Sequence, residues 1–263
     1  MIKERIILPS QGFPYNGKLE GSSIVVRPLT TRAYKDFLVT PNEEGVLNLV
    51  DSCLVDCPLK AEEFVYQDEL AIYLKIRSIS MGSLLPVYSI CPKCQIKNVE
   101  DWDIMQLECS YLSMDEYPLT VTLPDSQQKI KLCIPTGKTE RIAKEEAQKR
   151  ATRFERKVSD FLPSFKVATV IIVDGLNDLI EKSEWYNALT LRDAMFIDKV
   201  LDAMQDFGIH TSRSVKCKSC SHEYLVPLQI TQDFFRPDIG NIKGIKVSKG
   251  TLEEGPTDTD ETK

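Results

Sequence analysis

Two Cys-x-x-Cys pairs are the residues in this sequence with the clearest capacity for chemistry. Cys91 and Cys94 form the first pair, and Cys217 and Cys220 form the second within similar flanking residues. Each pair resembles a knuckle, a tight turn between two strands, and four thiolates suit tetrahedral zinc. We therefore predict one structural zinc ion shared by the two pairs, with no ligand position left open for catalysis.

The two pairs are far apart in the sequence, with 122 residues between Cys94 and Cys217. Closing a loop of this length costs about 5 kcal/mol of chain entropy. Structural zinc binding supplies roughly 10–16 kcal/mol, which exceeds that cost. The site would then act as a clasp that brings the N-terminal part of the chain next to the segment after Gly208.

Other readings of these cysteines stay open. The two pairs could be free thiols in turns, or redox dithiols, although two matching pairs fit a shared ligand set better than a thioredoxin-type motif. His222 could replace one thiolate. The remaining cysteines show no second ligand pattern and are expected to pack in the core: Cys53, Cys57, Cys109 and Cys133.

No catalytic constellation emerges from the rest of the sequence, so we do not expect an enzyme. There are only two histidines and no nucleophile-elbow motif. Residues 133–139 resemble a P-loop, but Leu132 stands where that motif needs a glycine. We expect a strand-to-helix turn there instead, capped by Thr136 or Thr139.

Composition favours a globular, soluble protein made in the cytoplasm. Hydrophobic residues make up 42% of the 263 residues and charged residues 27%, and no apolar run is long enough for a membrane helix. The start lacks the apolar stretch of a signal peptide. The net charge of −6 disfavours nucleic acid and anionic membranes as partners.

Hydrophobic periodicity and turn residues predict an α+β fold, a helical core with short β-hairpins and a zinc-ribbon-like four-cysteine site made from two distant knuckles. We expect an extended N-terminal arm with one short strand at 1–28, a zinc-stapled α+β domain at 29–247 and a disordered acidic tail at 248–263. Predicted helices start at Thr30 or Thr31, Asn42, Lys60 and Thr190 and reach Leu38, Cys53, Ser80 and Phe207. Predicted strands cover 84–90, 97–104, 119–123 and 129–134 and the flanks of the second knuckle.

Residues 138–161 predict one long helix, about 36 Å at 1.5 Å per residue. Its apolar side is a narrow seam of Ala143, Ala147 and Ala151. The helix could be a solvated face laced with ion pairs, a nucleic-acid contact, or a partner-binding helix, because small residues admit another helix closely. The run 167–173 could be strand or helix.

Several short motifs together resemble one protein family. They are Leu8-Pro-Ser-Gln-Gly-Phe-Pro-Tyr15, Asp174-Gly-Leu, Leu189-Thr-Leu-Arg-Asp193, Gly208-Ile209, the second cysteine pair and Phe234-Phe235-Arg-Pro237. This combination resembles the baseplate hub proteins of contractile-tailed bacteriophages of the T-even type. The resemblance implies a non-enzymatic structural or assembly protein of the virion tail baseplate. It would be assembled in the host cytoplasm, bind phage tail and baseplate proteins, and have no small-molecule substrate.

Partner contacts are expected on aromatic residues of the arm, the long helix and the C-terminal segment. The candidates are Phe13, Tyr15, Phe154, Phe234 and Phe235, with core packing as the alternative for the last two. The rival function is a zinc-ribbon regulatory protein that binds nucleic acid, which would show strongly salt-dependent binding.

Overall fold

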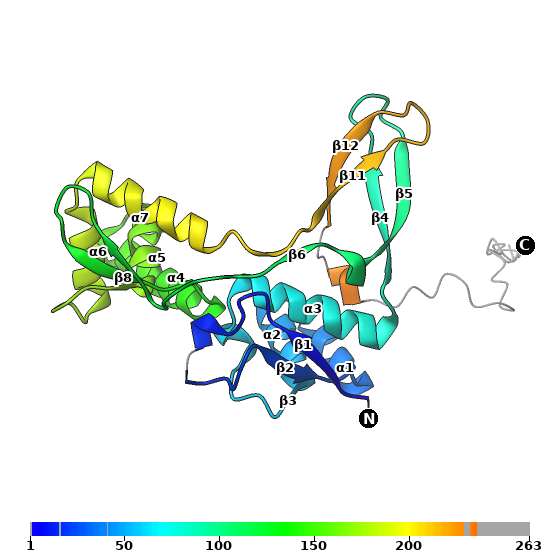
Figure 1. Ribbon diagram of the computed structural model, residues 1–263, viewed down its shortest axis with the longest axis horizontal. Helices are drawn as coiled ribbons and strands as arrows, with labels where there is room; N and C mark the ends of the chain where they lie inside the picture. Colours follow the sequence, from blue (N-terminus) through cyan, green and yellow to red (C-terminus); the bar gives the residue numbers. More distant parts are fainter. Residues whose placement is uncertain (1, 16, 41, 229–231, 236–263) are drawn as a thin grey trace, which may run out of the picture.

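The computed structural model describes residues 2–15, 17–40, 42–228 and 232–235. Figure 1 shows three parts: an N-terminal part at the bottom, a mostly helical part to the left, and a projecting arm of two β-hairpins. The chain runs from the N-terminal part into the first hairpin, crosses to the helical part, and returns to form the second hairpin. The predicted α+β fold is confirmed.

The N-terminal part combines a small antiparallel sheet with three helices. The sheet has the order β1 (Glu4–Ile7), β2 (Ser23–Val26) and β3 (Leu54–Val55). The helices are α1 (Thr31–Val39), α2 (Glu43–Cys53) and α3 (Tyr66–Met81). As predicted, the Asn42 side chain caps α2, here by accepting the Gly45 N–H, and Thr30 caps α1 by accepting the Ala33 N–H. The helix predicted from Lys60 begins later, because residues 61–63 form a separate 3-10 turn.

The expected extended arm at 1–28 is a folded part of this sheet. Two strands form in it, not one, because β1 pairs with β2 along its whole length. Between them, Leu8 is fully buried, and Tyr15 ends a 3-10 turn (Phe13–Tyr15) and is also buried. The segment is folded because its buried side chains pack against residues that are distant in sequence.

The helical part contains a second antiparallel sheet and four helices. The sheet has the order β7 (Leu119–Thr122), β8 (Lys129–Leu132) and β9 (Ile171–Ile172). The helices are α4 (Gly137–Phe154), α5 (Leu162–Val170), α6 (Leu179–Asn187) and α7 (Leu191–Met204). The run 167–173, undecided from sequence, ends α5 and continues as β9. Helix α6 was not predicted.

The predicted long helix is shorter than expected. Helix α4 stops at Phe154 because Glu155 takes a left-handed conformation, with φ 54°. A 3-10 turn (Val158–Asp160) and α5 then fold the chain back. Ala143 and Ala147 of the α4 seam pack against Phe165 of α5, and Ala151 is also buried, so the chain's own helix occupies the face that was considered for a partner.

Two extended connectors join the helical part to the rest and run antiparallel. Strand β6 (Cys109–Ser110) in the outgoing connector pairs with β10 (Gly208–Ile209) in the returning one. Gly208 has φ 110°, and a Cβ there would lie 2.9 Å from the Cβ of Gln67 on α3. The helix predicted to reach Phe207 ends earlier, at Met204. Gly208 does not stop the helix but allows the close approach of the returning connector to α3.

One large hydrophobic cluster reaches from the N-terminal sheet into the arm and the helical part. Phe64 and Trp102 are among its largest fully buried side chains. None of the described helices has the length and apolar character needed to cross a membrane. The predicted acidic tail at 248–263 lies outside the described residues.

Candidate metal centre

The projecting arm consists of two antiparallel hairpins. Strands β4 (Leu84–Ile90) and β5 (Lys97–Asp103) form the first, and β11 (Ser212–Lys216) and β12 (Glu223–Pro227) form the second. Side chains alternate between faces of a strand. The buried set turns one face of each hairpin inward: Val87, Asn98, Trp102, Val215 and Val226. The predicted hairpins around both cysteine pairs are confirmed.

Each cysteine pair sits in the turn of one hairpin, and the two turns have the same hydrogen bonds. In the first turn, the Cys91 N–H donates to the Ile96 carbonyl at 3.0 Å, and the Gln95 N–H donates to the Cys91 carbonyl at 2.9 Å. In the second turn, the Cys217 N–H donates to the His222 carbonyl at 2.9 Å, and the Ser221 N–H donates to the Cys217 carbonyl at 3.0 Å. The hairpin ladders therefore fix both turns in one geometry.

The residue after the second cysteine is left-handed in both turns. Gln95 has φ 60° and Ser221 has φ 56°. Glycine adopts this conformation without the steric cost that a side chain brings. Both turns keep this geometry with a non-glycine residue, so the surrounding hydrogen bonds compensate for the strain.

The structure brings the four predicted sulfur atoms together at the tip of the arm. The Sγ atoms of Cys91 and Cys220 are 3.7 Å apart, and those of Cys94 and Cys217 are 3.6 Å apart. All four lie within 4.8 Å of one another. Zinc–sulfur bonds of about 2.3 Å in a tetrahedron place the sulfurs about 3.8 Å apart, whereas a disulfide needs about 2.05 Å. The cluster therefore has the dimensions of a four-thiolate metal site.

The surroundings of the cluster favour the thiolate, the form that binds metals, at Cys217 but not at Cys94, where the hydrogen bond of the Ile96 backbone is outweighed by burial and the neighbouring thiols, which raise the pKa. The backbone N–H groups of Cys220 and Ser219 lower the pKa of the Cys217 thiol to about 6. The ammonium of Lys218, two residues before Cys220, donates to the Val99 carbonyl at 2.9 Å. It therefore links the second turn to strand β5.

Asn98 is a site residue that the sequence did not reveal. Its buried side chain on β5 donates from Nδ2 to the Cys217 sulfur at 3.6 Å and to the Tyr224 hydroxyl at 3.1 Å. Its Oδ1 accepts the Lys218 N–H at 3.1 Å. Asparagine is depleted in strands, so its presence at this position was the one available signal. One side chain thus connects the first hairpin to the second turn.

His222, the alternative ligand, is not part of the four-residue cluster. Its ring stacks on Tyr224, with centroids 6.3 Å apart and an interplanar angle of 10°. Residues 133–139, which resemble a P-loop in sequence, form a strand-to-helix turn. There the Thr136 side chain caps α4 by accepting the Thr139 N–H. That capped strand-to-helix turn was predicted.

Most of the aromatic residues proposed from sequence as partner contacts are unavailable at the surface. Tyr15, Phe234 and Phe235 are buried in the core. Tyr15 packs against Phe64, Phe235 packs against Phe37, and the guanidinium of Arg77 lies over the Phe234 ring. Phe13 is half-buried. Phe154 is 49% exposed, and it is the one candidate among the five that presents a large open surface.

Comparison with known proteins adds the family. The family described as T4 bacteriophage base plate protein matches residues 10–236, a range that contains both cysteine pairs and nearly all of the described elements. No curated protein and no solved structure gives a significant match. Because the family match spans most of the chain, this protein belongs to the T4 bacteriophage base plate protein family.

Proposed function

We propose that this protein is a structural or assembly component of the hub region of a phage tail baseplate, that it binds other tail proteins and that it catalyses no reaction. The family match over residues 10–236 carries the baseplate assignment. The protein would be assembled in the host cytoplasm and act in the tail of the virion.

The four-cysteine cluster holds one structural zinc ion in this proposal. Cys91, Cys94, Cys217 and Cys220 supply four soft ligands with the spacing of a tetrahedron. Four protein ligands complete the coordination of zinc and leave no position for a substrate, which supports a structural role.

Zinc at this position would give the arm its stiffness. Each hairpin is a two-stranded sheet, and a hairpin of that size is only marginally stable alone. The metal would join their tips across 123 sequence positions, and Asn98 reinforces the same junction. A rigid projection of this kind suits a protein whose task is to hold neighbouring subunits in register.

Metal analysis tests the zinc site. Protein purified without chelator should contain one equivalent of zinc, and the variant with both Cys94→Ser and Cys217→Ser should contain none. A Cys53→Ser, Cys57→Ser variant serves as the matched control, because those cysteines lie outside the cluster. Protein that contains no zinc, or zinc that persists after Cys94 and Cys217 are replaced, would remove the metal from the proposal.

A pull-down from infected cells tests the function. Tagged protein should recover tail and baseplate proteins, identified by mass. Recovery of polymerase or ribosomal components without tail proteins, together with salt-dependent retention of nucleic acid, would instead support the regulatory alternative.

A further inference from the structure

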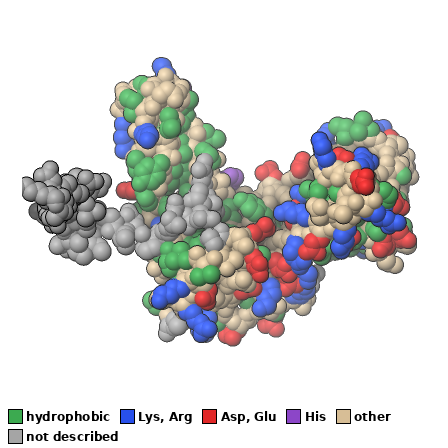
Figure 2. Space-filling model, turned by 180° about the vertical axis from the view of Figure 1, so that it is seen from behind, with side chains coloured by type: hydrophobic (Ala, Val, Ile, Leu, Met, Phe, Trp, Pro, Cys, Tyr) green, Lys and Arg blue, Asp and Glu red, His purple; other side chains and the backbone are tan. Residues whose placement is uncertain are grey.

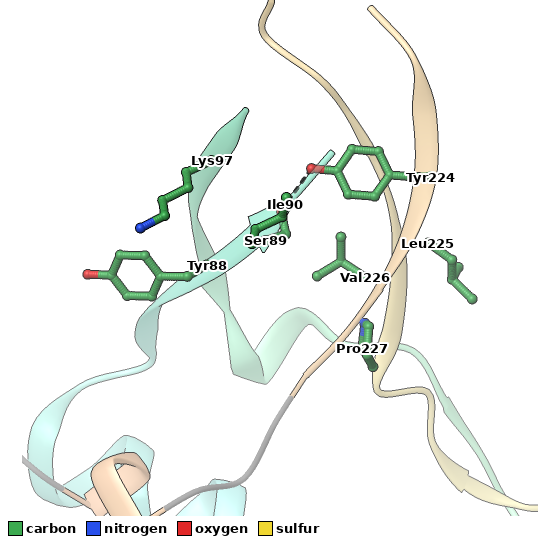
Figure 3. Close-up of a pocket in the computed structure, with 8 residues that line it drawn as sticks. All are labelled: Tyr88, Ser89, Ile90, Lys97, Tyr224, Leu225, Val226 and Pro227. Atoms are coloured by element: carbon green, nitrogen blue, oxygen red, sulfur yellow. Dashed lines mark hydrogen bonds between the residues drawn. The ribbon is translucent and has the colours of Figure 1, made fainter. Parts of the chain in front are cut away.

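A groove runs between the two hairpins of the arm. Tyr88, Ser89 and Ile90 of β4, with Lys97 of β5, line one side, and residues 224–227 of β12 line the other, around a volume of about 630 Å³. In Figure 3, Tyr224 and Val226 point from β12 toward β4, while Leu225 points away. Consecutive residues of a strand point to opposite faces. A groove that touches every residue in turn therefore follows the strand edges, where backbone is accessible.

The hydrogen-bond phase of the first hairpin shows which backbone groups face the open edge of β4. The Cys91 N–H donates to the Ile96 carbonyl at one end of the hairpin, and the Ile104 N–H donates to the Ser83 carbonyl at the other end. Hydrogen-bonded and non-hydrogen-bonded pairs alternate along an antiparallel ladder. Tyr88 and Ile90 therefore occupy non-hydrogen-bonded positions, with N–H and C=O groups directed away from β5.

The second hairpin gives the same result for β12. Cys217 bonds to His222 at its tip, and the Leu228 N–H donates to the Thr211 carbonyl at its base. The alternation then directs the N–H and C=O groups of Leu225 away from β11. Pro227 occupies a position of the same phase, as Pro86 does on β4, and neither needs a ladder donor.

These edges have no strand partner in the part of the chain that the structure describes. There, β4 pairs only with β5, and β12 pairs only with β11. A strand edge with free donors and acceptors is a template for pairing with another chain. The groove beside residues 224–227 has room for a segment of about four residues, at roughly 3.4 Å per residue.

Side chains beside the groove favour an apolar strand with an acidic residue. Tyr88, Ile90 and Leu225 are 74%, 56% and 68% exposed. Lys97 is the one charged residue that lines the groove. Figure 2 shows hydrophobic side chains along the arm and basic ones toward its tip. Alternating apolar side chains on an added strand would contact Tyr88, Ile90 and Leu225, and a carboxylate on that strand would pair with Lys97.

We propose that the arm binds an extended strand of another tail protein by β-strand addition along this groove. The strand would hydrogen-bond to the backbone of Leu225 on β12, with Tyr88 and Ile90 of β4 across the groove, and would carry alternating apolar residues with a carboxylate facing Lys97. This inference rests on the proposed function, since it names the surface through which the baseplate partner is held.

Charge disfavours two other occupants. A second copy of the arm would bring two like-charged tips together, because Lys93, Lys97, Lys216 and Lys218 outnumber Glu223, the one carboxylate in residues 89–98 and 214–224. The chain's own segment 238–247 has apolar residues, but its two cations, Lys243 and Lys246, outnumber its one carboxylate, Asp238. An acidic strand from a different protein is the complementary choice.

Peptide binding to the full-length, zinc-loaded protein tests this directly. The probes are labelled, overlapping peptides about fifteen residues long that span the tail proteins of the same phage, and binding is followed by fluorescence anisotropy. At least one peptide with an alternating apolar pattern and an acidic residue should bind. N-methylation of single peptide nitrogens should weaken its binding at every second position, because only alternate N–H groups face the arm.

Two proline variants form a matched pair. Leu225→Pro removes the N–H that faces the groove and should weaken peptide binding by about tenfold or more. Ser214→Pro, at the position directly opposite on β11, removes an N–H that faces the other edge of the same hairpin and should leave binding unchanged. Both residues are exposed, and zinc content checks that each variant keeps the arm folded. Lys97→Glu should also weaken binding.

The outcomes separate this inference from the proposed function. Full-length tail proteins that still bind Leu225→Pro and Lys97→Glu at wild-type affinity would overturn the groove while leaving the baseplate role intact. A dimer of this chain that Leu225→Pro dissociates, or N-methylation effects without a period of two, would also overturn it. Failure of every full-length tail protein to bind the unmodified protein would overturn the proposed function itself.

Discussion

The hydroxyl of Tyr15 donates a hydrogen bond of 2.7 Å to the buried carboxylate of Asp68, which joins the N-terminal segment to helix α3. The same hydroxyl accepts the Val65 N–H at 2.8 Å, and the Ser10 N–H donates to Asp68 at 2.8 Å. The Ser10 hydroxyl also contacts this carboxylate. Residues 8–15, one of the motifs behind the family resemblance, thus form a latch on the core.

Removing the Tyr15 hydroxyl should destabilise the N-terminal part. Tyr15→Phe leaves the Val65 N–H without its acceptor and Asp68 without one donor, so we expect a loss of about 1–3 kcal/mol in the free energy of unfolding. Urea denaturation followed by far-UV circular dichroism measures it. Tyr88→Phe is the matched control, because Tyr88 is exposed. Equal losses in the two variants would show that the latch is not the cause.

The same latch should make stability depend on pH. Burial raises the pKa of Asp68 above 3.8, although hydrogen bonds from Ser10 and Tyr15 oppose the rise. The folded state therefore holds this proton more tightly than the unfolded state does. The contribution of Asp68 to stability is greatest below the unfolded pKa and declines as pH rises through the folded pKa.

Asp68→Asn isolates this effect, because the amide does not titrate. Between about pH 4 and neutrality, the free energy of unfolding of the wild type should fall relative to that of Asp68→Asn. The variant should have a lower baseline, since its amide places donors against the hydroxyls of Ser10 and Tyr15. Denaturation curves measured across this pH range give the comparison, and parallel pH profiles would contradict the assignment.

Local chemistry explains why much of the metal centre could be predicted. Two Cys-x-x-Cys pairs within strand-like flanks specify both turns, and the hairpins then determine where the sulfurs point. The N-caps of α2 and α7 could also be predicted, because the side chains of Asn42 and Thr190 accept hydrogen bonds from N–H groups only three positions later. Asn98 was not, since its role depends on Lys218 and Cys217, more than one hundred positions later.

Most of the wrong predictions come from contacts that are distant in sequence, and one comes from a local exception to a sequence rule. Nothing local distinguishes a surface Tyr15 or Phe235 from a buried one, because aromatic residues suit both cores and interfaces. The end of α4 was hidden because Glu155 adopts the left-handed conformation that sequence patterns associate with glycine. The alanine seam indicated a close helix correctly, but its partner is α5 of the same chain.

Asn98 should tune the affinity of the metal site. Residues that hydrogen-bond to metal ligands commonly contribute 10–100-fold to affinity. Asn98→Ala removes the contact with the Cys217 sulfur and the acceptor for the Lys218 N–H, so zinc affinity should fall by about that factor. Competition with a chromophoric chelator measures it. Asn48→Ala, at an exposed position of α2, should bind zinc as the wild type does.

Glycine at the left-handed turn position should stabilise the arm. Gln95 has φ 60°, and a left-handed residue with a side chain costs about 1–2 kcal/mol, which exceeds the extra entropy that glycine loses on folding. Gln95→Gly should therefore raise the stability of the arm by up to about 1 kcal/mol. Hydrogen exchange of β4 and β5 amides in the zinc-loaded protein reports it. Lys93→Gly, in the same turn but without a positive φ, should speed exchange instead; slower exchange in both variants would point to another cause.

The interface between α4 and α5 should not tolerate a larger side chain. Ala143 and Ala147 are fully buried against Phe165, so Ala147→Leu adds three carbon atoms to a filled contact. Overpacking of this kind costs about 1–3 kcal/mol. Thermal unfolding should show a lower midpoint for Ala147→Leu, whereas Lys144→Leu, at an exposed position of the same helix, should change it little. A wild-type midpoint for Ala147→Leu would mean that α4 stands free in solution, and its seam would again be open to a partner helix.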